Sequence, residues 1–468
     1  MTTQSKICIT VWNKYCWTNS TDTVILKVIY DLLAYEIPNS RFTYSQSPIK
    51  SFLTKKNAFK TGFLPYVYQK LLQYSVEVEL IDKRDNVFAI DPEELQLALP
   101  SGNLRDRQKE GMDSLIKSPF PETFIWQRGI INAATNFGKN WIITAMVRSV
   151  MHKSKVVITV HRRELFAQLY EFFIENHIAV HRYGSYKNYT YRELGIVTLV
   201  MPTSMFPNIE TSEVQTFLSD VGTLIVDECH RATADDYSTV LSKVNASTVW
   251  YLSGTPFTGE ANHDLSIVGD SGDVIFKVSN SELIADKVSL TPTVKFYNIS
   301  GFDMAPTYED EKQDIIHCPE RLRIITEAIT ENINDVFLIS VATKEHGNYL
   351  YNKLVLLPTT VDFLYSGDFL RDEKLIAYKE GRIKVLICTE VLKEGVNIPL
   401  VRTLINAAWG QSVVWVKQFV GRLLRSDGVS TTCTVIDFLD KGHNTRKHSF
   451  TRYNYYQKEG FEINIIEN

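Results

Sequence analysis

A chain of 468 residues, 44% of them hydrophobic, is too long for one packed core and predicts two or three domains. Its net charge of −4 excludes a nucleic-acid binder that acts through overall basicity, so such a role must rest on local patches. The six cysteines form no C-x-x-C pair, which disfavours a disulfide framework or a zinc site and indicates a reducing compartment. The chain shows no signal pattern and no apolar run near the ~20 residues that cross a bilayer, so we expect a cytoplasmic protein without membrane contact.

Residues 1–95 lack a regular alternation of strands and helices and are predicted to form a small separate module. Between residues 37 and 76 this module has no acidic side chain, and aromatic residues such as Phe59 and Phe63 lie among its lysines. Basic side chains neutralise phosphates, and aromatic rings stack on unpaired bases, so the segment predicts DNA binding. The alternative is that the aromatics are core and the lysines a solvated face. The lysines predicted to contact DNA are Lys50, Lys55, Lys56 and Lys60.

A phosphate-binding loop is predicted in NAATNFGKNW, residues 132–141, between the apolar run 129–134 and a following helix. Backbone N–H groups at a helix start bind phosphate oxygens, and the lysine of such a loop reaches the β- and γ-phosphates. Asn136 stands where a glycine is usual, but Asn tolerates a positive φ; the Asn140 amide offers an oxygen to Mg²⁺. The alternative is an ordinary strand–loop–helix with a chance Gly-Lys. The predicted loop residues are Thr135, Asn136, Phe137, Gly138, Lys139 and Asn140.

A first series of apolar runs predicts strands buried on both faces of a parallel sheet. The runs are residues 129–134, 155–160, 195–200, 222–228 and 247–255. The fourth run ends in Asp227 and Glu228, far enough after Lys139 for the intervening strands to complete one sheet. Phosphoryl transfer to water needs one carboxylate on the metal and another to orient the water, although an acidic pair after a strand is commonly a solvated turn.

A second series of apolar runs predicts a second α/β unit. The runs are residues 335–341, 361–367, 383–390, 403–409 and 431–438. The polar, acidic segment 301–314 is predicted to be a surface loop near the boundary between the two units. In QFVGRLLR, residues 418–425, two arginines share one face of a packed helix and need an anionic partner, as an arginine finger would; the alternative is a solvated basic face. The predicted domains are residues 1–95, 96–288 and 289–468.

Taken in order, the loop, DECH (227–230), SGTP (253–256), TEVLKEGVNIP (389–399) and QFVGRLLR resemble the motifs of superfamily 2 helicases and translocases over residues 100–440. The resemblance implies an α/β fold with two tandem RecA-like parallel-sheet domains after a small α+β N-terminal DNA-binding domain, and use of ATP and Mg²⁺. It assigns catalytic roles to Lys139 at the phosphates, Asp227 at Mg²⁺, Glu228 at the attacking water, and Gln418, Arg422 and Arg425 in the second domain. It further implies nucleotide contacts for Arg105, Gln108, Glu394 and Gly395, coupling roles for His230, Ser253 and Thr255, and nucleic-acid contacts for Arg162, Arg163, Thr203 and Thr389.

Residues 39–71 are similar to the N-terminal region of bacteriophage UvsW-type helicases, and the basic-aromatic run 441–458 to the segment that follows their last motif. In that run Arg446 and Lys447 are further expected DNA contacts. The resemblance implies a monomeric motor, in the host cytoplasm if phage-encoded, that like RecG remodels forks, Holliday junctions and D-loops. Three alternatives remain: a superfamily 2 translocase of the restriction or excision-repair type, an RNA helicase, and a non-hydrolysing DNA-binding module with a degenerate phosphate loop.

Overall fold

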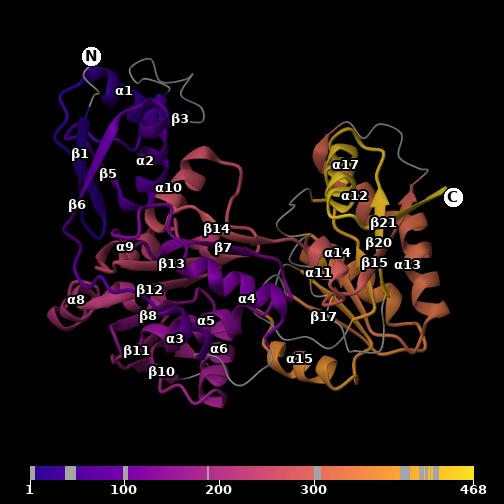
Figure 1. Cartoon of the computed structure of the whole chain (residues 1–468). Helices are drawn as coiled ribbons and strands as arrows, with labels where there is room; N and C mark the ends of the chain where they lie inside the picture. The colour runs from indigo at the N-terminus through magenta and orange to yellow at the C-terminus, as the bar shows by residue number, and fades with distance from the viewer. Residues whose placement is uncertain are drawn as a thin grey trace. The chain divides into compact units, whose positions relative to one another are not determined.

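The computed structural model describes residues 6–36, 49–97, 104–186, 189–299, 307–389, 401–410, 416, 420–421, 423–424 and 432–467. The chain divides into two compact units (Figure 1). Unit 1 comprises residues 1–133 and 137–278, and unit 2 comprises residues 134–136 and 279–468. The N-terminal module therefore belongs to the same compact unit as the first α/β domain.

The N-terminal module is a four-stranded sheet with helices on one face. Its strand order is β5-β2-β1-β6, in which β1 pairs antiparallel with β2 and parallel with β6. Side chains alternate between the faces of a strand, so Ile7, Ile9 and Val11 are buried on the inner face. The elements are β1 Lys6–Val11, β2 Tyr15–Thr18, α1 Thr23–Leu32, β3 Ala34–Glu36, β4 Ile49–Ser51, β5 Ala58–Lys60, η2 Thr61–Phe63, α2 Leu64–Gln73 and β6 Glu77–Asp82.

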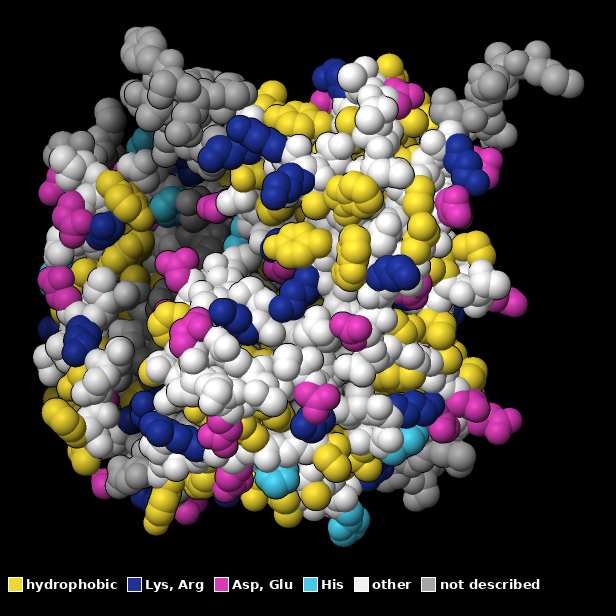
Figure 2. Space-filling view, turned by 90° about the vertical axis from the view of Figure 1, so that its left-hand side faces the viewer, with side chains coloured by type: hydrophobic (Ala, Val, Ile, Leu, Met, Phe, Trp, Pro, Cys, Tyr) yellow, Lys and Arg dark blue, Asp and Glu magenta, His cyan; other side chains and the backbone are white. Residues whose placement is uncertain are grey.

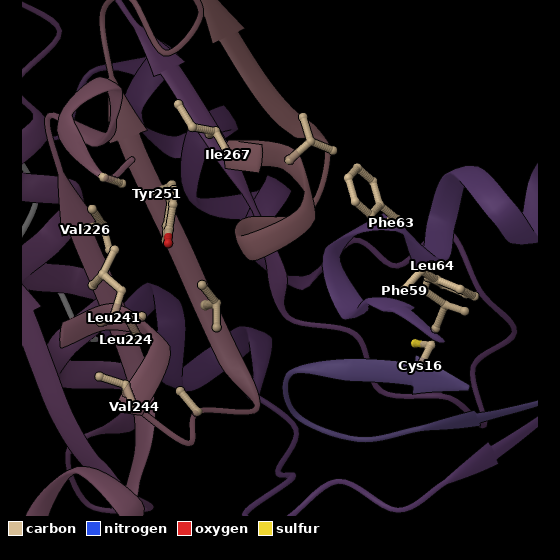
Figure 3. Close-up of a cluster of buried hydrophobic side chains, with 14 of the residues drawn as sticks. Cys16, Phe59, Phe63, Leu64, Leu224, Val226, Leu241, Val244, Tyr251 and Ile267 are labelled. Atoms are coloured by element: carbon tan, nitrogen blue, oxygen red, sulfur yellow. The ribbon is translucent and has the colours of Figure 1, made fainter. Parts of the chain in front are cut away.

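The module and the first α/β domain share one hydrophobic core. Figure 3 shows side chains of this core from both parts, with Phe59 and Phe63 of the module on one side of the view and Tyr251 of the α/β domain on the other. The helix η2 lies so close to α10 (Ala261–Ser271) that a Cβ at Gly62 would overlap the backbone of α10. Of the two interpretations that the sequence leaves open for Phe59 and Phe63, the structure therefore favours the core, because both rings are fully buried and stabilise the module.

A buried arginine fastens the module to the α/β domain. The Arg128 guanidinium is 4% exposed and donates to four backbone carbonyl oxygens, those of Asn13 (2.6 Å), Ala246 (3.0 Å), Asp270 (3.1 Å) and Ser247 (3.2 Å). Burial lowers the pKa of Arg128 to about 10, which still leaves it charged at neutral pH. One cation thus bridges the module, the residues just before β13 (Thr248–Ser253) and the end of α10.

We expect Arg128→Met to lower the thermal unfolding midpoint of the full chain by about 5 °C or more. Methionine keeps the length of the side chain but leaves four buried carbonyl groups without their donor, at a cost of about 2–4 kcal/mol. Differential scanning calorimetry measures the change, with Arg192→Met at an exposed position as the matched control. Equal midpoints for the two variants would contradict the bridging role.

The first α/β domain contains an eight-stranded sheet, parallel except for β10. Its order is β10-β9-β11-β8-β12-β13-β7-β14. All five predicted strands of the first series are present. The strands are β7 Arg128–Ala133, β8 Lys155–Thr159, β9 His181–Tyr186, β10 Tyr189–Arg192, β11 Val197–Val200, β12 Val221–Asp227, β13 Thr248–Ser253 and β14 Val274–Val278. The helices include α4 Asp106–Asp113, α5 Lys139–Val150, α6 Arg163–Glu175, α7 Pro202–Met205, α8 Ser212–Ser219 and α9 Asp235–Lys243.

Unit 2 contains a seven-stranded, wholly parallel sheet of order β17-β18-β16-β19-β20-β15-β21. All five predicted strands of the second series are present. The strands are β15 Thr291–Asn298, β16 Phe337–Ser340, β17 Val361–Leu364, β18 Val385–Cys388, β19 Thr403–Asn406, β20 Thr432–Leu439 and β21 Glu462–Glu467. The helices include α11 Asn280–Ala285, α12 Tyr308–His317, α13 Pro319–Glu331, α14 Lys344–Leu354, α15 Arg371–Lys379 and α17 His443–Lys458.

The predicted surface loop 301–314 is a helix from residue 308 onward, and its first six residues lie outside the described ranges. Thr307 and Asp310 form a capping box, in which each side chain accepts from the other's backbone N–H. The acids that suggested a loop instead favour the start of α12, where the helix dipole stabilises negative charge. Glu311 is buried and accepts backbone N–H groups at the start of α17.

Unit 2 also buries a histidine that titrates far below its usual range. The ring of His346 stacks on Trp409, with the centroids 5.8 Å apart, and is 2% exposed. Burial, reinforced by the positive charge of Arg321 and by His317, lowers the pKa of His346 to about 3. In the unfolded chain this histidine takes up a proton near pH 6.5.

We expect the stability of unit 2 to fall as the pH drops from about 6.5 toward 3. Over this window His346 is protonated in the unfolded state but stays neutral in the folded state. The free energy of unfolding therefore decreases with falling pH, by roughly 2 kcal/mol at pH 5. His346→Phe keeps a stacking ring without titration, so the loss of thermal stability between pH 7 and pH 5 should shrink. His443→Phe, at an exposed position, is the control, and the same pH response in all three proteins would refute the assignment.

All six cysteines are free thiols, five of them buried. In the ranges that the structure describes, no helix is long and apolar enough to span a membrane.

Candidate active site

Three motifs meet at one edge of the eight-stranded sheet. The strands β12, β13 and β7 are adjacent and parallel, so their carboxyl ends lie together. There β12 ends at Asp227, β13 ends at Ser253, and β7 leads through residues 134–138 to Lys139 at the start of α5. Ligands of open α/β sheets bind at this edge.

The loop after β7 has the backbone of a phosphate-binding loop despite its unusual sequence. Asn136 has φ 73° and Gly138 has φ 88°, both left-handed. Asn136 therefore adopts the conformation for which a glycine is common, as Asn can at little steric cost. At Gly138 a Cβ would lie 2.5 Å from Gln108 Nε2 and 3.0 Å from Arg105 Nη2, so a larger residue would displace these side chains, and it would be strained at a φ of 88°. Gly138 caps α5, whose first N–H groups and dipole favour an anion.

Arg105 and Gln108 hold the shape of this loop. Gln108 Nε2 donates to the Phe137 carbonyl oxygen at 2.7 Å, and Arg105 Nη2 donates to the same oxygen. The Gln108 Oε1 in turn accepts from the Arg105 backbone N–H at 3.1 Å. The side chain of Phe137 is buried against Phe276, which leaves only its backbone for a nucleotide. Adenine contacts by Arg105 and Gln108 stay a prediction.

The Lys139 ammonium lies between the two acids of the second motif. Its Nζ is 2.6 Å from Glu228 Oε1 and 3.9 Å from Asp227 Oδ1. Burial alone would lower the pKa of Lys139, but the two carboxylates outweigh it and raise the pKa above its usual value. Burial, together with the Glu228 carboxylate, raises the pKa of Asp227, and Lys139 opposes that shift. The single buried cation thus offsets part of the negative charge of the two acids.

A polar network runs from Glu228 to the end of β13. The Ser253 hydroxyl donates to Glu228 Oε2 at 3.4 Å and accepts from the Thr255 backbone N–H at 3.0 Å. His230 Nδ1 lies 3.3 Å from Ser253 Oγ and 3.5 Å from Glu228 Oε2. Glu228 itself has φ 50°, a left-handed conformation that turns the chain directly after the strand. Of the three predicted coupling residues, Ser253 and His230 therefore lie next to the acid, and Thr255 is joined to it through Ser253.

The residues Asp227 and Asn140 fit a magnesium site of the kind completed by phosphate oxygens. Mg²⁺ in nucleotide sites takes one or two protein oxygens and fills its remaining positions with phosphates and water. Asp227 ends β12 beside the phosphate loop, and Asn140 is the second residue of α5. Within the described ranges no cluster of three or more His, Cys, Asp or Glu side chains forms an all-protein metal cage.

The predicted nucleic-acid contacts of the first α/β domain follow neighbouring strands at the same sheet edge. Arg162 and Arg163 lie at the start of α6 after β8, and Thr203 lies in α7 after β11. Arg163 and Thr203 are exposed, and Arg162 is half-buried. In unit 2, Thr389 directly follows β18. The remaining predicted residues, Gln418, Arg422, Arg425, Glu394 and Gly395, lie outside the described residues and stay predictions.

The predicted basic contacts differ in how far they are exposed. Lys50, Lys55 and Lys56 of the module are exposed, as are Arg446 and Lys447 on α17. Lys60, by contrast, is half-buried, and its Nζ lies 2.7 Å from Asp270 Oδ1 at the end of α10. Lys60 thus helps to dock the module on the α/β domain.

A set of exposed aromatic residues in the module was not predicted from the sequence. Trp12, Tyr15 and Trp17 all lie on the outer face of the sheet, away from the buried Cys16. The signal was available in TVWNKYCWT, residues 10–18, where aromatic residues alternate with buried ones on either side of a hairpin turn.

The sequence matches two family descriptions in tandem. Residues 101–258 match the family of the type III restriction enzyme res subunit, and residues 320–427 match the helicase conserved C-terminal domain. A sequence relative is the ATP-dependent DNA helicase UvsW of Enterobacteria phage T4, 23% identical over 372 residues that cover 73% of this chain and 72% of that protein.

Two solved structures share the fold. S. cerevisiae Dbp5 bound to RNA and ADP BeF3 has a TM-score of 0.56 at 19% identity, covering 81% of this chain and 94% of Dbp5. The ATP-dependent type ISP restriction-modification enzyme LlaBIII bound to DNA has a TM-score of 0.56 at 13% identity, covering 86% of this chain and 34% of that enzyme. Because one binds RNA and the other DNA, the likeness identifies the fold and does not choose between the two nucleic acids.

Proposed function

We propose that this chain, an ATP-hydrolysing superfamily 2 helicase similar to UvsW, uses ATP and Mg²⁺ to remodel branched DNA such as forks, Holliday junctions and D-loops. The observation that carries the proposal is the contact of the Lys139 ammonium with Glu228 and Asp227. This contact lies beside a loop in which Asn136 and Gly138 have a left-handed backbone conformation. Such a set provides a phosphate ligand, a metal ligand and a carboxylate for water.

In the proposed reaction, Lys139 leaves its carboxylate partners and binds the β- and γ-phosphates, while the loop and the start of α5 supply backbone N–H groups. Asp227 and Asn140 would hold Mg²⁺, which when bound neutralises charge on the phosphates. Glu228, released from Lys139, orients the attacking water and accepts its proton. Since Glu228 bonds to Ser253, the loss of the γ-phosphate alters a contact that continues to the Thr255 backbone.

The choice of branched DNA rests on the extent of the similarity to UvsW and on the exposed lysines of the module. We further propose that the protein acts as a monomer in the cytoplasm of a phage host. The test is a panel of fork, Holliday-junction, D-loop, linear-duplex and RNA-duplex substrates with ATP, measured side by side. We expect ATP-driven strand separation on the branched DNA substrates and a higher rate of ATP hydrolysis in their presence.

Two alternatives give distinct results in the same panel. An RNA helicase would unwind the RNA duplex and leave the junctions intact. A binding module with a degenerate phosphate loop would bind DNA without hydrolysing ATP above background, although the retained Lys139, Asp227 and Glu228 argue against decay of the site.

Neutralising the exposed lysines of the module should reduce the salt dependence of DNA binding. We expect the combined change Lys50→Gln, Lys55→Gln and Lys56→Gln to flatten the slope of log K against log salt by about 2 for single-stranded DNA, because each lost phosphate contact removes about 0.7. Titration of a labelled oligonucleotide at several salt concentrations measures the slope. Lys60→Gln is the control, since Lys60 pairs with Asp270, and an unchanged slope in the triple variant would show that these lysines do not touch phosphate.

A further inference from the structure

The outer face of the module's sheet carries aromatic side chains where polar ones are usual. Trp12 is 44% exposed, Tyr15 51% and Trp17 40%. The Trp12 backbone N–H donates to the Tyr15 carbonyl oxygen at 2.9 Å across the hairpin turn, and Trp17 lies opposite Thr10 in the register of β1 and β2. An antiparallel pair with one solvated face normally places polar residues there, so the three rings are an exception.

These rings do not contribute to the core of the module. The core lies on the other face, where Ile9, Val11 and Cys16 pack with α1 and α2. On the outer face, each of the three rings is at least 40% exposed. Figure 2 shows this side of the molecule, with hydrophobic side chains gathered in its upper part and Lys and Arg side chains around them. The aromatic face is defined here as Trp12, Tyr15 and Trp17.

Charge differs between the two edges of the aromatic face. On the β5 side, the turn before the strand carries Lys55 and Lys56, both exposed. On the β6 side, Glu77 and Glu79 pair with a single lysine, Lys6. A polyanion that crosses this face is therefore attracted by Lys55 and Lys56 and repelled by Glu77 and Glu79.

The spacing of the rings suits separate bases. Tyr15 and Trp17 are two residues apart on one strand, so their Cα atoms are about 6.8 Å apart. That is about twice the 3.4 Å rise between successive bases of a strand, so each ring can receive its own base. The bases of a duplex are already stacked on one another and offer no free face, which excludes duplex DNA as the preferred occupant.

We propose that the aromatic face binds a single strand of DNA, with unpaired bases stacked on Trp12, Tyr15 and Trp17 and the backbone on the side of Lys55 and Lys56. This inference rests on the proposed function in one respect, that the strand is DNA. Lys14, between the rings in sequence, donates to the Ser242 carbonyl oxygen of the α/β domain and holds the hairpin in place. The aromatic face is thus joined to the first α/β domain, so that a DNA strand separated by the helicase can be held there.

The test compares the full chain with Trp12→Leu and Trp17→Leu in the absence of ATP. Leucine keeps an apolar side chain and removes the aromatic plane. We expect each change to weaken binding of a labelled oligo-dT by about 5- to 150-fold, the effect of losing one base–aromatic stack. Trp17→Phe should restore most of the affinity. The slope of log K against log salt should stay unchanged in Trp17→Leu, because the phosphate contacts remain.

Tyr74→Leu is the matched control, since Tyr74 is 56% exposed in the same module but follows α2 rather than lying on the sheet. Cross-linking locates the bound strand directly, so that strand binding at the edge of the eight-stranded sheet does not hide a loss of binding at the aromatic face. An oligonucleotide that contains 5-iododeoxyuridine is irradiated with the protein, and the cross-linked peptide is identified by mass spectrometry. We expect cross-links within residues 12–17.

The proposal is overturned if no cross-link falls within residues 12–17, if duplex binding drops as much as single-strand binding, or if the tryptophan dependence appears only with an RNA oligonucleotide. It is also overturned if Trp17→Leu converts a dimer into a monomer in sedimentation, which would make the face a contact between copies. Failure of the proposed function is separate. Wild-type protein that cross-links through this face yet leaves branched DNA intact would refute the remodelling activity and keep the single-strand site.

Discussion

Replacing Lys139 by alanine is expected to lower the rate of ATP hydrolysis by at least about 10³-fold and to weaken ATP binding. The lysine is the only cation within 4 Å of both acids among the described residues, and its proposed partner in the reaction is the charge on the phosphates. Binding of single-stranded DNA without ATP should change little, since none of the predicted DNA contacts touches this side chain. Steady-state hydrolysis, nucleotide titration and oligonucleotide binding measure the three effects.

Lys155→Ala is the matched control for this variant. Lys155 also pairs with a carboxylate, Asp220 at 2.7 Å, but it lies at the amino end of β8, on the opposite edge of the sheet. Its loss should leave hydrolysis unchanged. Near-normal ATP hydrolysis by Lys139→Ala would show that the phosphate loop is not part of the catalytic site.

Replacing Glu228 by glutamine should separate ATP binding from hydrolysis. Glutamine keeps the size of the side chain and an oxygen for Lys139, but it does not accept a proton from water. We therefore expect kcat to fall by about 10²- to 10⁴-fold with ATP affinity retained, the range typical of a lost general base. Single-turnover hydrolysis and a nucleotide-binding titration on the same protein test the separation.

Glu213→Gln, on the solvent side of α8, controls for the change of one charge in the same domain. If Glu228→Gln weakened ATP binding as strongly as Lys139→Ala, the acid would serve to position the lysine and not the water. If it hydrolysed ATP at the normal rate, another group would have to accept the proton.

The strands of both α/β units could be predicted because a parallel sheet covered by helices buries both faces. Runs such as residues 155–160 and 383–390 are therefore apolar without interruption, and such runs are visible in a sequence. The loop of Lys139 and the acids after β12 could be predicted for a related reason. Their chemistry demands particular residue types at strand ends, and Asn136 shows that a backbone conformation can survive the loss of the usual glycine.

The α12 helix was not predicted from the sequence. The acidic residues at its start, which include the capping Asp310 and the buried Glu311, give the segment the composition of an acidic surface loop. The sequence also left open whether Phe59 and Phe63 are core residues or base-stacking residues. Local composition says that rings and lysines are close in sequence, but it does not say on which face of a strand each ring lies.

By itself the sequence determined the buried strands of both α/β units, the order of the motifs and the positions of Lys139, Asp227 and Glu228 beside strand ends, because all of these depend on neighbours along the chain. Only the tertiary structure decided that Lys139 meets Glu228, that Arg128 joins the module to the α/β domain, and that Trp12, Tyr15 and Trp17 are exposed. Each of those facts depends on which distant segments pack together, and packing is set by the burial of whole surfaces and not by any local pattern.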